Sequence, residues 1–599
     1  MLDKTKSTPE PEADPEPVPK HRLRQLIDLL ASGLDRLRLR LANPEALLLL
    51  SLLAVITGLL TGLIIVLFRL LITWLHTWLL PSGVPEDFES LSALMRLGLP
   101  LIGAGLLILL FVPLSPGQRQ VGVVYLIERL HYYQGRLRSI NALTQFLGAL
   151  ISLGFGFSVG REGPSVHMGG YGGSWLAQRL QLPNNSNRTL IACGVAAAIG
   201  ASFNTPLAGI IFAMEVILQQ YTVQGFAPVI LAAVSGTYLS LGLLDEELFF
   251  SIELLPASNY EWPLIGLLGI SIGALSACFN FALIQITRRG ASWPFWLRFL
   301  LAGSAMGVIG WWVPQSMGTG YDTINQVMNG QLGQTLLTEI LIAKLLATLL
   351  CLGLGIPGGV IGPLMFIGSV AGGVVVITMY SSNIGVLIPH DPKLYPLLGM
   401  GAMFAASLQA PLAGLTAVME LAGNETIVLP AMLAIVTASL TSKVIFHHDS
   451  LFRSLLRARG LDHSSSPVVQ RLHMIGAASI MNRSFMLCDS QLSRNAAALI
   501  LHRGNQWLVL TGPERKPEVM IPALEVQRFM EAHPEAETID LTNIPGKHLK
   551  LVAASFRASL QDVMESLNAS GAEAVYLQRE QERRIYGVVT RTQITKTYL

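Results

Sequence analysis

The chain has 599 residues, of which 51% are hydrophobic and only 13% are charged, and its mean hydropathy is +0.51. Soluble globular domains carry about 25% charged residues, so this composition excludes an ordinary soluble protein and predicts a polytopic membrane protein with soluble ends. The formal net charge of +2 gives no sign of nucleic-acid binding. The four cysteines, Cys193, Cys278, Cys351 and Cys488, form no CxxC pair and indicate neither a disulfide framework nor a metal site.

Residues 1–43 are predicted to form a tail. Residues 1–20 are rich in proline and acidic residues, which is typical of disorder. Residues 21–41 carry apolar residues at helical spacing with arginines between them. This pattern predicts a basic amphipathic helix that lies either on the membrane surface or against the C-terminal domain. Basic flanks favour the cytoplasmic side for this end of the chain.

Residues 44–460 are predicted to form the transmembrane domain. Two strong hydrophobic spans come first, at 46–75 and 97–112. Shorter pieces broken by Gly and Pro follow at 139–159, 164–182, 188–202, 206–219 and 226–243. Two longer segments come next, at 263–287 and 296–313. A second set of short pieces follows at 335–353, 360–379, 394–408, 411–422 and 426–446. Short, interrupted segments in two halves are typical of discontinuous helices that meet at a binding site.

An internal repeat supports this view. "AAAIGASFNTPLAGIIFAMEVI" at 196–217 resembles "GAMFAASLQAPLAGLTAVMELA" at 401–422. Upstream of these blocks, "EGPSVHMGG" aligns loosely with "IGPLMFIGS". Two matched blocks in the same order predict an internal duplication, with repeats at about 97–243 and 296–446.

Residues 461–599 have the composition of a soluble domain. "NQWLVLTG" and "AVYLQREQERRIYGVVT" predict strands, whereas "LSRNAAALILHRG" and "SLQDVMESLNASG" predict helices. We expect a small α/β domain of two similar halves, on the same side of the membrane as the basic run at 453–459.

The motif "GREGP" at 160–164 places charges within a hydrophobic region. It and "GGVIGP" at 358–363 both look like helix starts, where exposed N–H groups and the helix dipole bind anions. A carboxylate at Glu162 would occupy such an anion site, and its protonation would release the site. Glu162 is therefore a candidate gate and proton carrier. The alternative is that it only caps its helix or pairs with Arg161.

The motifs "GREGPSVHMGG" and "GIPGGVIGP" and the two "PLAG…E" blocks resemble the CLC family of chloride channels and proton-coupled chloride antiporters, over about 46–460. The C-terminal part resembles the paired CBS domains of many members. The resemblance implies an all-helical inverted repeat of broken, tilted helices and a homodimer in which each subunit has its own anion pathway. It also implies a plasma-membrane (inner-membrane) location with both termini cytoplasmic.

Carried over by motif, Glu162 matches the external gating glutamate of the family. The rest of that motif is Gly160, Arg161, Gly163 and Pro164. Val360 and Ile361 match positions whose backbone N–H groups bind the central anion.

Three positions depart from the family pattern. The serine that contacts the central anion is missing from "GQRQVGVV", where Gln120 or Val121 takes its place, so chloride, nitrate and fluoride all remain open as the anion. Val216 replaces the internal proton glutamate of many antiporters, as in passive channels. Phe452 replaces a pore-lining tyrosine and lacks its hydroxyl. These departures favour a passive, voltage- or pH-gated chloride channel, and a proton-coupled antiporter is the alternative.

Other ionisable residues have structural interpretations. His167 follows Glu162 by five residues, which is not a metal-ligand spacing on a helix, so we expect a packing or gate-neighbour role. Glu215 and Glu420 occupy equivalent repeat positions and are expected to cap a neighbouring helix or pair with a buried base. Lys344 either raises the potential along the anion path, or snorkels, or pairs with Glu420.

No cofactor is predicted for the membrane domain. The CBS-like domain either binds an adenine nucleotide, with Asp540 or Thr590 near the ribose, or acts as a ligand-free module that stabilises a dimer. No HExxH or GxSxG motif supports catalysis. We therefore expect a transporter rather than an enzyme or a sensor.

Overall fold

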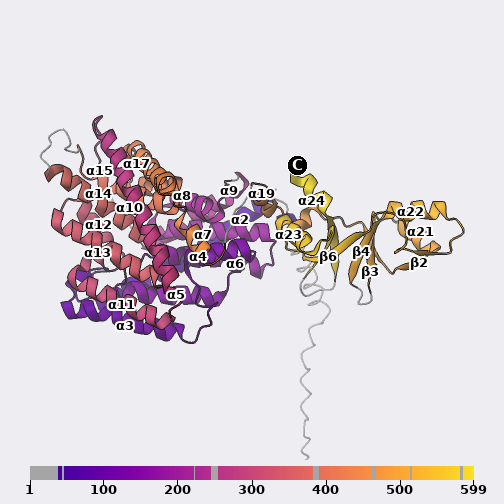
Figure 1. Ribbon diagram of the computed structural model, residues 1–599, viewed down its shortest axis with the longest axis horizontal. Coiled ribbons are helices and arrows are strands. Elements are labelled where there is room, and N and C mark those ends of the chain that lie inside the picture. Colours follow the sequence, from indigo (N-terminus) through magenta and orange to yellow (C-terminus); the bar gives the residue numbers. More distant parts are fainter. Residues whose placement is uncertain are drawn as a thin grey trace, which may run out of the picture.

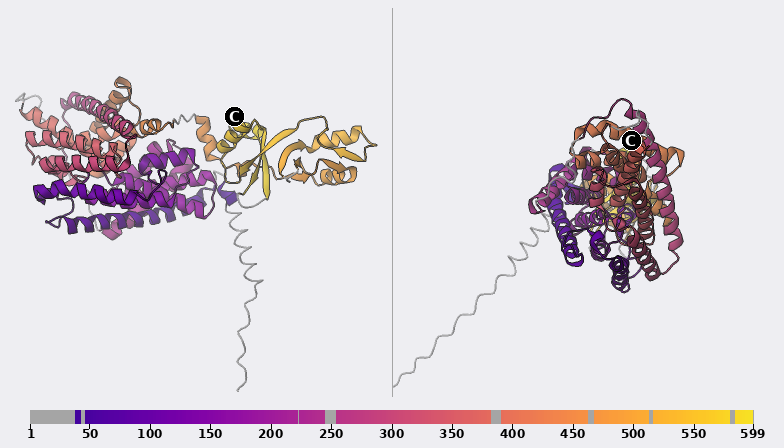
Figure 2. Two further views of the ribbon diagram at one scale, coloured as in Figure 1. Left: turned by 60° about the horizontal axis from the view of Figure 1, so that its bottom comes forward. Right: turned by 90° about the vertical axis from the view of Figure 1, so that its left-hand side faces the viewer.

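The structure, a computed structural model, contains a helical body and a smaller domain of strands and helices that extends from one side of it (Figure 1). Figure 2 shows the same arrangement from two other sides. This confirms a mostly helical polytopic fold followed by an α/β domain. Most of the predicted amphipathic segment at 21–41 lies outside the described residues. The structure describes residues 38–42, 46–221, 223–244, 254–381, 390–461, 467–512, 516–579 and 584–598.

The first half of the helical body contains long helices separated by short, broken ones. Its elements are α2 (Leu47–Leu79), η1 (Phe88–Ser90), α3 (Ala93–Phe111), α4 (Gly122–Tyr132), α5 (Ser139–Gly154), α6 (Glu162–Arg179), α7 (Asn184–Phe203), α8 (Pro206–Phe212), η2 (Ala213–Leu218) and α9 (Val223–Leu244).

The second half repeats this alternation. Its elements are α10 (Glu261–Gly290), α11 (Phe295–Trp312), η3 (Pro314–Ser316), α12 (Tyr321–Met328), α13 (Gln334–Gly353), α14 (Ile361–Ser381), α15 (Leu394–Leu408), α16 (Pro411–Ala422), η5 (Glu425–Ile427), α17 (Val428–Leu440), η6 (Thr441–Ile445) and α18 (Leu451–Ala458).

The breaks between helices have the same cause in both halves. Helix α7 ends where Asn204 adopts a left-handed conformation (φ 58°), and α8 starts two residues later with Pro206 in its first turn. Helix α15 ends in the same way at Gln409 (φ 53°), before Pro411 starts α16. A proline fits the first turn of a helix but disfavours helical backbone just before it. The chain therefore turns at equivalent places in the two repeats.

Among the described residues, eight helices are long and apolar enough to cross a membrane. The outer helices expose large apolar side chains, such as Leu48, Trp78 and Leu109. Such exposure suits lipid, which is as apolar as these side chains. The protein is therefore a multi-span membrane protein.

The C-terminal domain contains a six-stranded sheet in the order β1-β3-β4-β6-β7-β8. The pair β1/β3 is parallel and β3/β4 antiparallel, and the pairs β6/β7 and β7/β8 repeat this pattern, so the domain has two similar halves. Its elements are α19 (Pro467–Met474), α20 (Ala477–Ile480), β1 (Phe485–Cys488), β2 (Gln491–Ser493), α21 (Arg494–His502), β3 (Trp507–Thr511), β4 (Pro517–Pro522), α22 (Ala523–Ala532), β5 (Thr538–Asp540), β6 (Leu549–Ser555), α23 (Leu560–Ser570), β7 (Ala574–Gln578), β8 (Ile585–Thr590) and α24 (Arg591–Tyr598).

The C-terminal domain contacts the start of α7. The Arg557 side chain donates to the carbonyl oxygen of Leu182 at 2.7 Å, and the N–H of Asn184 donates to the Arg557 carbonyl oxygen at 2.8 Å. The Asn184 side chain also donates to Asp562 at 2.9 Å. The far end of α7 lies beside the charged motif at 160–164, because Arg161 donates to the Ser202 carbonyl oxygen at 3.3 Å.

Candidate functional site

The carboxylate of Glu162 is fully buried at the start of a helix from the other repeat. The backbone N–H of Gly362, in the first turn of α14, donates to Glu162 Oε2 at 3.0 Å. The Tyr321 hydroxyl donates to Glu162 Oε1 at 2.5 Å. Glu162 therefore does not simply cap its own helix α6. It occupies the anion-binding end of α14, where N–H groups and the helix dipole favour a negative charge.

Glycines make this arrangement possible. The two extended segments before α6 and α14 are joined by a pair of backbone hydrogen bonds between Gly160 and Gly359, each 2.7 Å long. A Cβ atom at Gly160 would overlap Glu162 Oε2, and one at Gly359 would overlap the backbone of Gly163. Gly160 thus supplies room for the carboxylate, and its N–H donates to the Gly359 carbonyl oxygen.

Two cavities are lined by segments that neighbour Glu162. The first, the Arg119 cavity, has a volume of about 690 Å³ and includes Val121, Val360 and Phe452 in its lining. The second, the Arg161 cavity, has a volume of about 500 Å³ and includes Tyr321. Tyr321 binds the Glu162 carboxylate directly, and Val360 lies two residues before Gly362. Glu162 itself lines neither cavity, but its two hydrogen-bond donors lie on segments that do.

The charges of the cavities differ. Among the described residues, the charged side chains that line the Arg119 cavity are all arginines: Arg119, Arg288, Arg298 and Arg459. Arg459 also pairs with Glu128 at 3.2 Å. The lining of the Arg161 cavity is mixed: it contains Arg69, Arg161 and His76 as well as Glu86 and Asp322. A cleft lined by charges of one sign raises the local concentration of counter-ions, so the Arg119 cavity favours anions.

The region that lacks the expected serine forms the start of α4. Gln120 and Val121 both line the Arg119 cavity, and Val121 directly precedes the helix. The N–H of Gly122 donates to His167 Nδ1 at 3.2 Å. The His167 ring also packs 5.1 Å from the ring of Tyr125. His167 therefore has the packing role expected for it and also accepts the first amide of α4.

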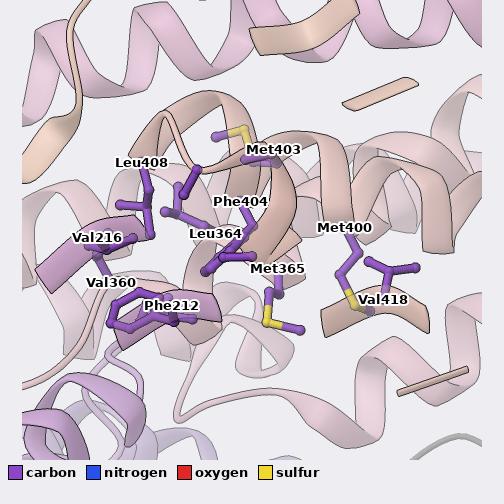
Figure 3. Packing of buried hydrophobic residues seen from close by; sticks show 14 of the residues in the cluster. Phe212, Val216, Val360, Leu364, Met365, Met400, Met403, Phe404, Leu408 and Val418 are labelled. Atoms are coloured by element: carbon purple, nitrogen blue, oxygen red, sulfur yellow. The ribbon is translucent and has the colours of Figure 1, made fainter. Parts of the chain in front are cut away.

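The two substituted positions lie in different surroundings. Figure 3 shows Val216 among hydrophobic side chains that include Val360, Phe212 and Leu408. Phe452 is 5% exposed and lines the Arg119 cavity. Ile361 lies beside Glu162 and lines a small void of about 20 Å³.

Glu215 and Glu420 cap helices of the opposite repeat. The Glu420 carboxylate accepts the N–H groups of Leu207 and Ala208 at the start of α8, at 2.9 and 2.7 Å. The Glu215 carboxylate accepts those of Leu412 and Ala413 at the start of α16, at 3.4 and 2.8 Å. The expected capping role is confirmed for both.

The expected pairing of Lys344 with Glu420 is wrong. Lys344 is fully buried, and its ammonium group donates to the carbonyl oxygens of Ser316, Gly318 and Thr319 at 3.2, 2.8 and 3.4 Å. These carbonyls precede Tyr321, so the lysine orders the segment that leads to the site. A buried ammonium needs such acceptors.

The candidate ribose contacts in the C-terminal domain have local partners. The Asp540 carboxylate accepts the hydroxyl and the N–H of Thr542 at 2.6 and 3.0 Å, and these bonds hold the pKa of Asp540 below its usual range. The Thr590 hydroxyl is engaged with Gln593. Both residues serve local turns in this structure, and their contact with a nucleotide stays a prediction.

Sequence reasoning missed Tyr321. The motif "GTGYDTI" has a Gly before the tyrosine, and Gly320 has a φ of 81°, but neither feature indicates a contact with a residue 159 positions away. Only the duplicated architecture brings α12 to the start of α6.

Comparisons with known proteins identify the family of the chain. Residues 98–443 match the family model described as voltage gated chloride channel. The H(+)/Cl(-) exchange transporter ClcA of Yersinia pestis bv. Antiqua (strain Angola) is 31% identical over 355 residues, which cover 55% of this chain and 73% of that protein. The protein of the same name from Vibrio cholerae serotype O1 (strain M66-2) is 29% identical over 337 residues, or 52% of this chain and 69% of that protein.

Solved structures show the same fold. A slow cyanobacterial Cl−/H+ antiporter matches with a TM-score of 0.61 and 22% identity, over 68% of this chain and 97% of that chain. A eukaryotic CLC transporter matches with a TM-score of 0.58 and 18% identity, over 91% of this chain and 97% of that chain. The second match is wide enough to reach into the C-terminal domain.

Proposed function

Because the chain belongs to the voltage-gated chloride channel family, we propose that it moves chloride across the membrane in exchange for protons. Glu162 acts as the gate and as the proton carrier. The observation that carries this proposal is the buried Glu162 carboxylate at the N–H of Gly362, beside segments that line two cavities. The alternative is the passive channel that Val216 and Phe452 predict, and the relatives named as exchange transporters favour exchange.

A single carboxylate at this position couples the two ions. The negative Glu162 side chain and an incoming chloride compete for the same amide at the start of α14. A proton neutralises the carboxylate and weakens its hold on that amide, so chloride takes its place. When the anion leaves, the carboxylate returns to the amide and the proton must depart. The arginines of the Arg119 cavity supply anions to this step.

Other features of the pathway follow from this assignment. The N–H groups near Val360 and Ile361 hold the anion on the side of the Arg119 cavity. Val216 is surrounded by apolar side chains and Glu215 is occupied with α16, so the proton reaches the Arg119 side by another route. A homodimer with cytoplasmic termini, a transmembrane domain at 44–460 and a CBS-like regulatory domain at 461–599 complete the proposal.

The test uses the purified full chain in liposomes under a chloride gradient, with chloride efflux and external pH recorded together. We expect protons to move against their gradient in fixed proportion to chloride. Chloride flow without proton movement would instead support the passive channel.

The variant Glu162→Gln mimics the protonated gate. We expect its chloride flux to persist, to lose its pH dependence and to carry no protons. The exposed Glu425→Gln is the matched control and should behave like the wild type. If Glu162→Gln instead unfolds, or keeps the wild-type pH dependence, Glu162 is a structural residue and the proposal fails.

A further inference from the structure

We propose that Tyr321 is a positioning residue for the gate: its hydroxyl holds the Glu162 carboxylate in the anion pathway and sets how readily the carboxylate leaves. This inference rests on the proposed role of Glu162. The hydroxyl donates to Glu162 Oε1, whereas the amide of Gly362 donates to Oε2. Each carboxylate oxygen thus has a donor from the second repeat.

The tyrosine ring is held firmly in place. Tyr321 starts α12 after Gly320, and it is 9% exposed. The ring of Phe203 meets it edge-on with centroids 6.0 Å apart, and the guanidinium group of Arg161 lies 5.1 Å from its centroid. A buried phenol fixed in this way donates its hydrogen bond along one direction, which is the direction of Glu162.

Tyr321 also separates the carboxylate from the Arg161 cavity. Tyr321 and Arg161 line that cavity, while Glu162 is fully buried behind them. The path from this cavity to the carboxylate therefore passes Tyr321, whose hydroxyl acts on the gate through its bond to Glu162.

Several charged groups face this pair. Arg161 lies beside both side chains and favours the carboxylate. Glu86 and Asp322 share the Arg161 cavity with Tyr321 and oppose a negative charge there. The ammonium group of Lys344 lies behind Gly320, which precedes the tyrosine. All of these groups stay in place when only the hydroxyl is removed, so Tyr321→Phe isolates the hydrogen bond.

The size of the effect follows from the strength of a hydrogen bond to a charged acceptor. Removing such a bond changes an equilibrium constant by about ten- to a hundredfold. In Tyr321→Phe, the carboxylate should leave the amide of Gly362 at least about ten times more readily. The pH at which chloride flux is half-maximal should therefore move upward by about one unit or more.

The experiment measures chloride flux in liposomes between pH 4 and 9 for the full-length wild type, Tyr321→Phe, Glu162→Gln and the double variant. We expect Tyr321→Phe to shift the pH profile upward, and we expect no further effect of it when Glu162 is already Gln. Tyr395→Phe is the matched control, because Tyr395 is also a buried tyrosine whose hydroxyl donates to a glutamate, Glu261, at 3.5 Å. It should leave the profile unchanged.

A second variant keeps the proposal testable if Tyr321→Phe does not fold. Incorporation of 3-fluorotyrosine at position 321 preserves the ring and makes the hydroxyl a stronger donor, so the pH profile should move downward. An unchanged profile in this variant, or equal effects of Tyr321→Phe with and without the Glu162 carboxylate, would overturn the proposal. If Glu162→Gln itself has no effect on the profile, the proposed function fails instead.

Discussion

Glu420 caps α8 and Glu215 caps α16, and we call these two contacts the reciprocal caps. Their contribution to the free energy of unfolding can be predicted. Glu420→Gln keeps the shape of the side chain but removes its charge and one of its acceptor oxygens at the start of α8. Loss of a charge at a helix N-terminus costs about 0.3–1 kcal/mol, and loss of a hydrogen bond to a charged acceptor costs about 1.5–3 kcal/mol. Because Leu207 and Ala208 both donate at 2.9 Å or less, we expect Glu420→Gln to cost about 2 kcal/mol.

Glu215→Gln should also be destabilising: the bond from Leu412 is long at 3.4 Å, but the Tyr221 hydroxyl also donates to this carboxylate. The two caps meet where α8 packs against α16, so the double variant should not be additive. The assay is thermal or denaturant unfolding of the purified protein, with Glu425→Gln as the exposed control, which should stay within about 0.5 kcal/mol of the wild type.

The reasoning would be refuted if Glu420→Gln unfolded like Glu425→Gln. It would also be refuted if Glu215→Gln lost proton movement while keeping full stability, since Glu215 would then carry protons instead of capping α16.

Two further predictions concern other parts of the chain. Burial, with Asp322 and Asp87 adding to it, raises the pKa of Glu89 to about 7, above its ordinary value of 4.5. The contribution of Glu89 to the free energy of unfolding is therefore complete below pH 4.5 and is lost as the pH rises through 7. Compared with the wild type, Glu89→Gln should gain about 1 kcal/mol more stability at pH 8 than at pH 4, a value reduced for solvent screening because the side chain is half-exposed. Unfolding of both proteins at the two pH values measures this difference. Phe452→Tyr adds a hydroxyl to the lining of the Arg119 cavity and should lower the dissociation constant for chloride about two- to tenfold, as measured by calorimetry. An unchanged dissociation constant would show that this side chain does not reach the anion.

Much of the helical body could be predicted because hydrophobic segments and their breaks are local signals. Pro206 and Pro411 mark the starts of α8 and α16, and the structure begins both helices there. The capping role of Glu215 and Glu420 could also be inferred, since a duplicated acid beside a duplicated helix start suggests a shared structural task.

The partners of the central residues could not be predicted, because they come from the other repeat. Glu162 meets Gly362 and Tyr321 across separations of 200 and 159 residues. The short helix α12 has a polar sequence, "YDTINQVM", that gives no hydrophobic signal for a membrane protein. The acceptors of Lys344 could not be predicted either, since they are backbone carbonyls, which leave no trace in the side-chain pattern.

The reciprocal caps also impose an order on synthesis. The start of α8 emerges from the ribosome 213 residues before Glu420, its capping residue. At about 5–20 residues per second, its amides wait for about 10–40 seconds. Helix α16 has no such delay, because its capping residue Glu215 is synthesised before it. The two capping sites are symmetric in the folded protein but differ during synthesis, because the cap of α8 in the first repeat is supplied by the second repeat.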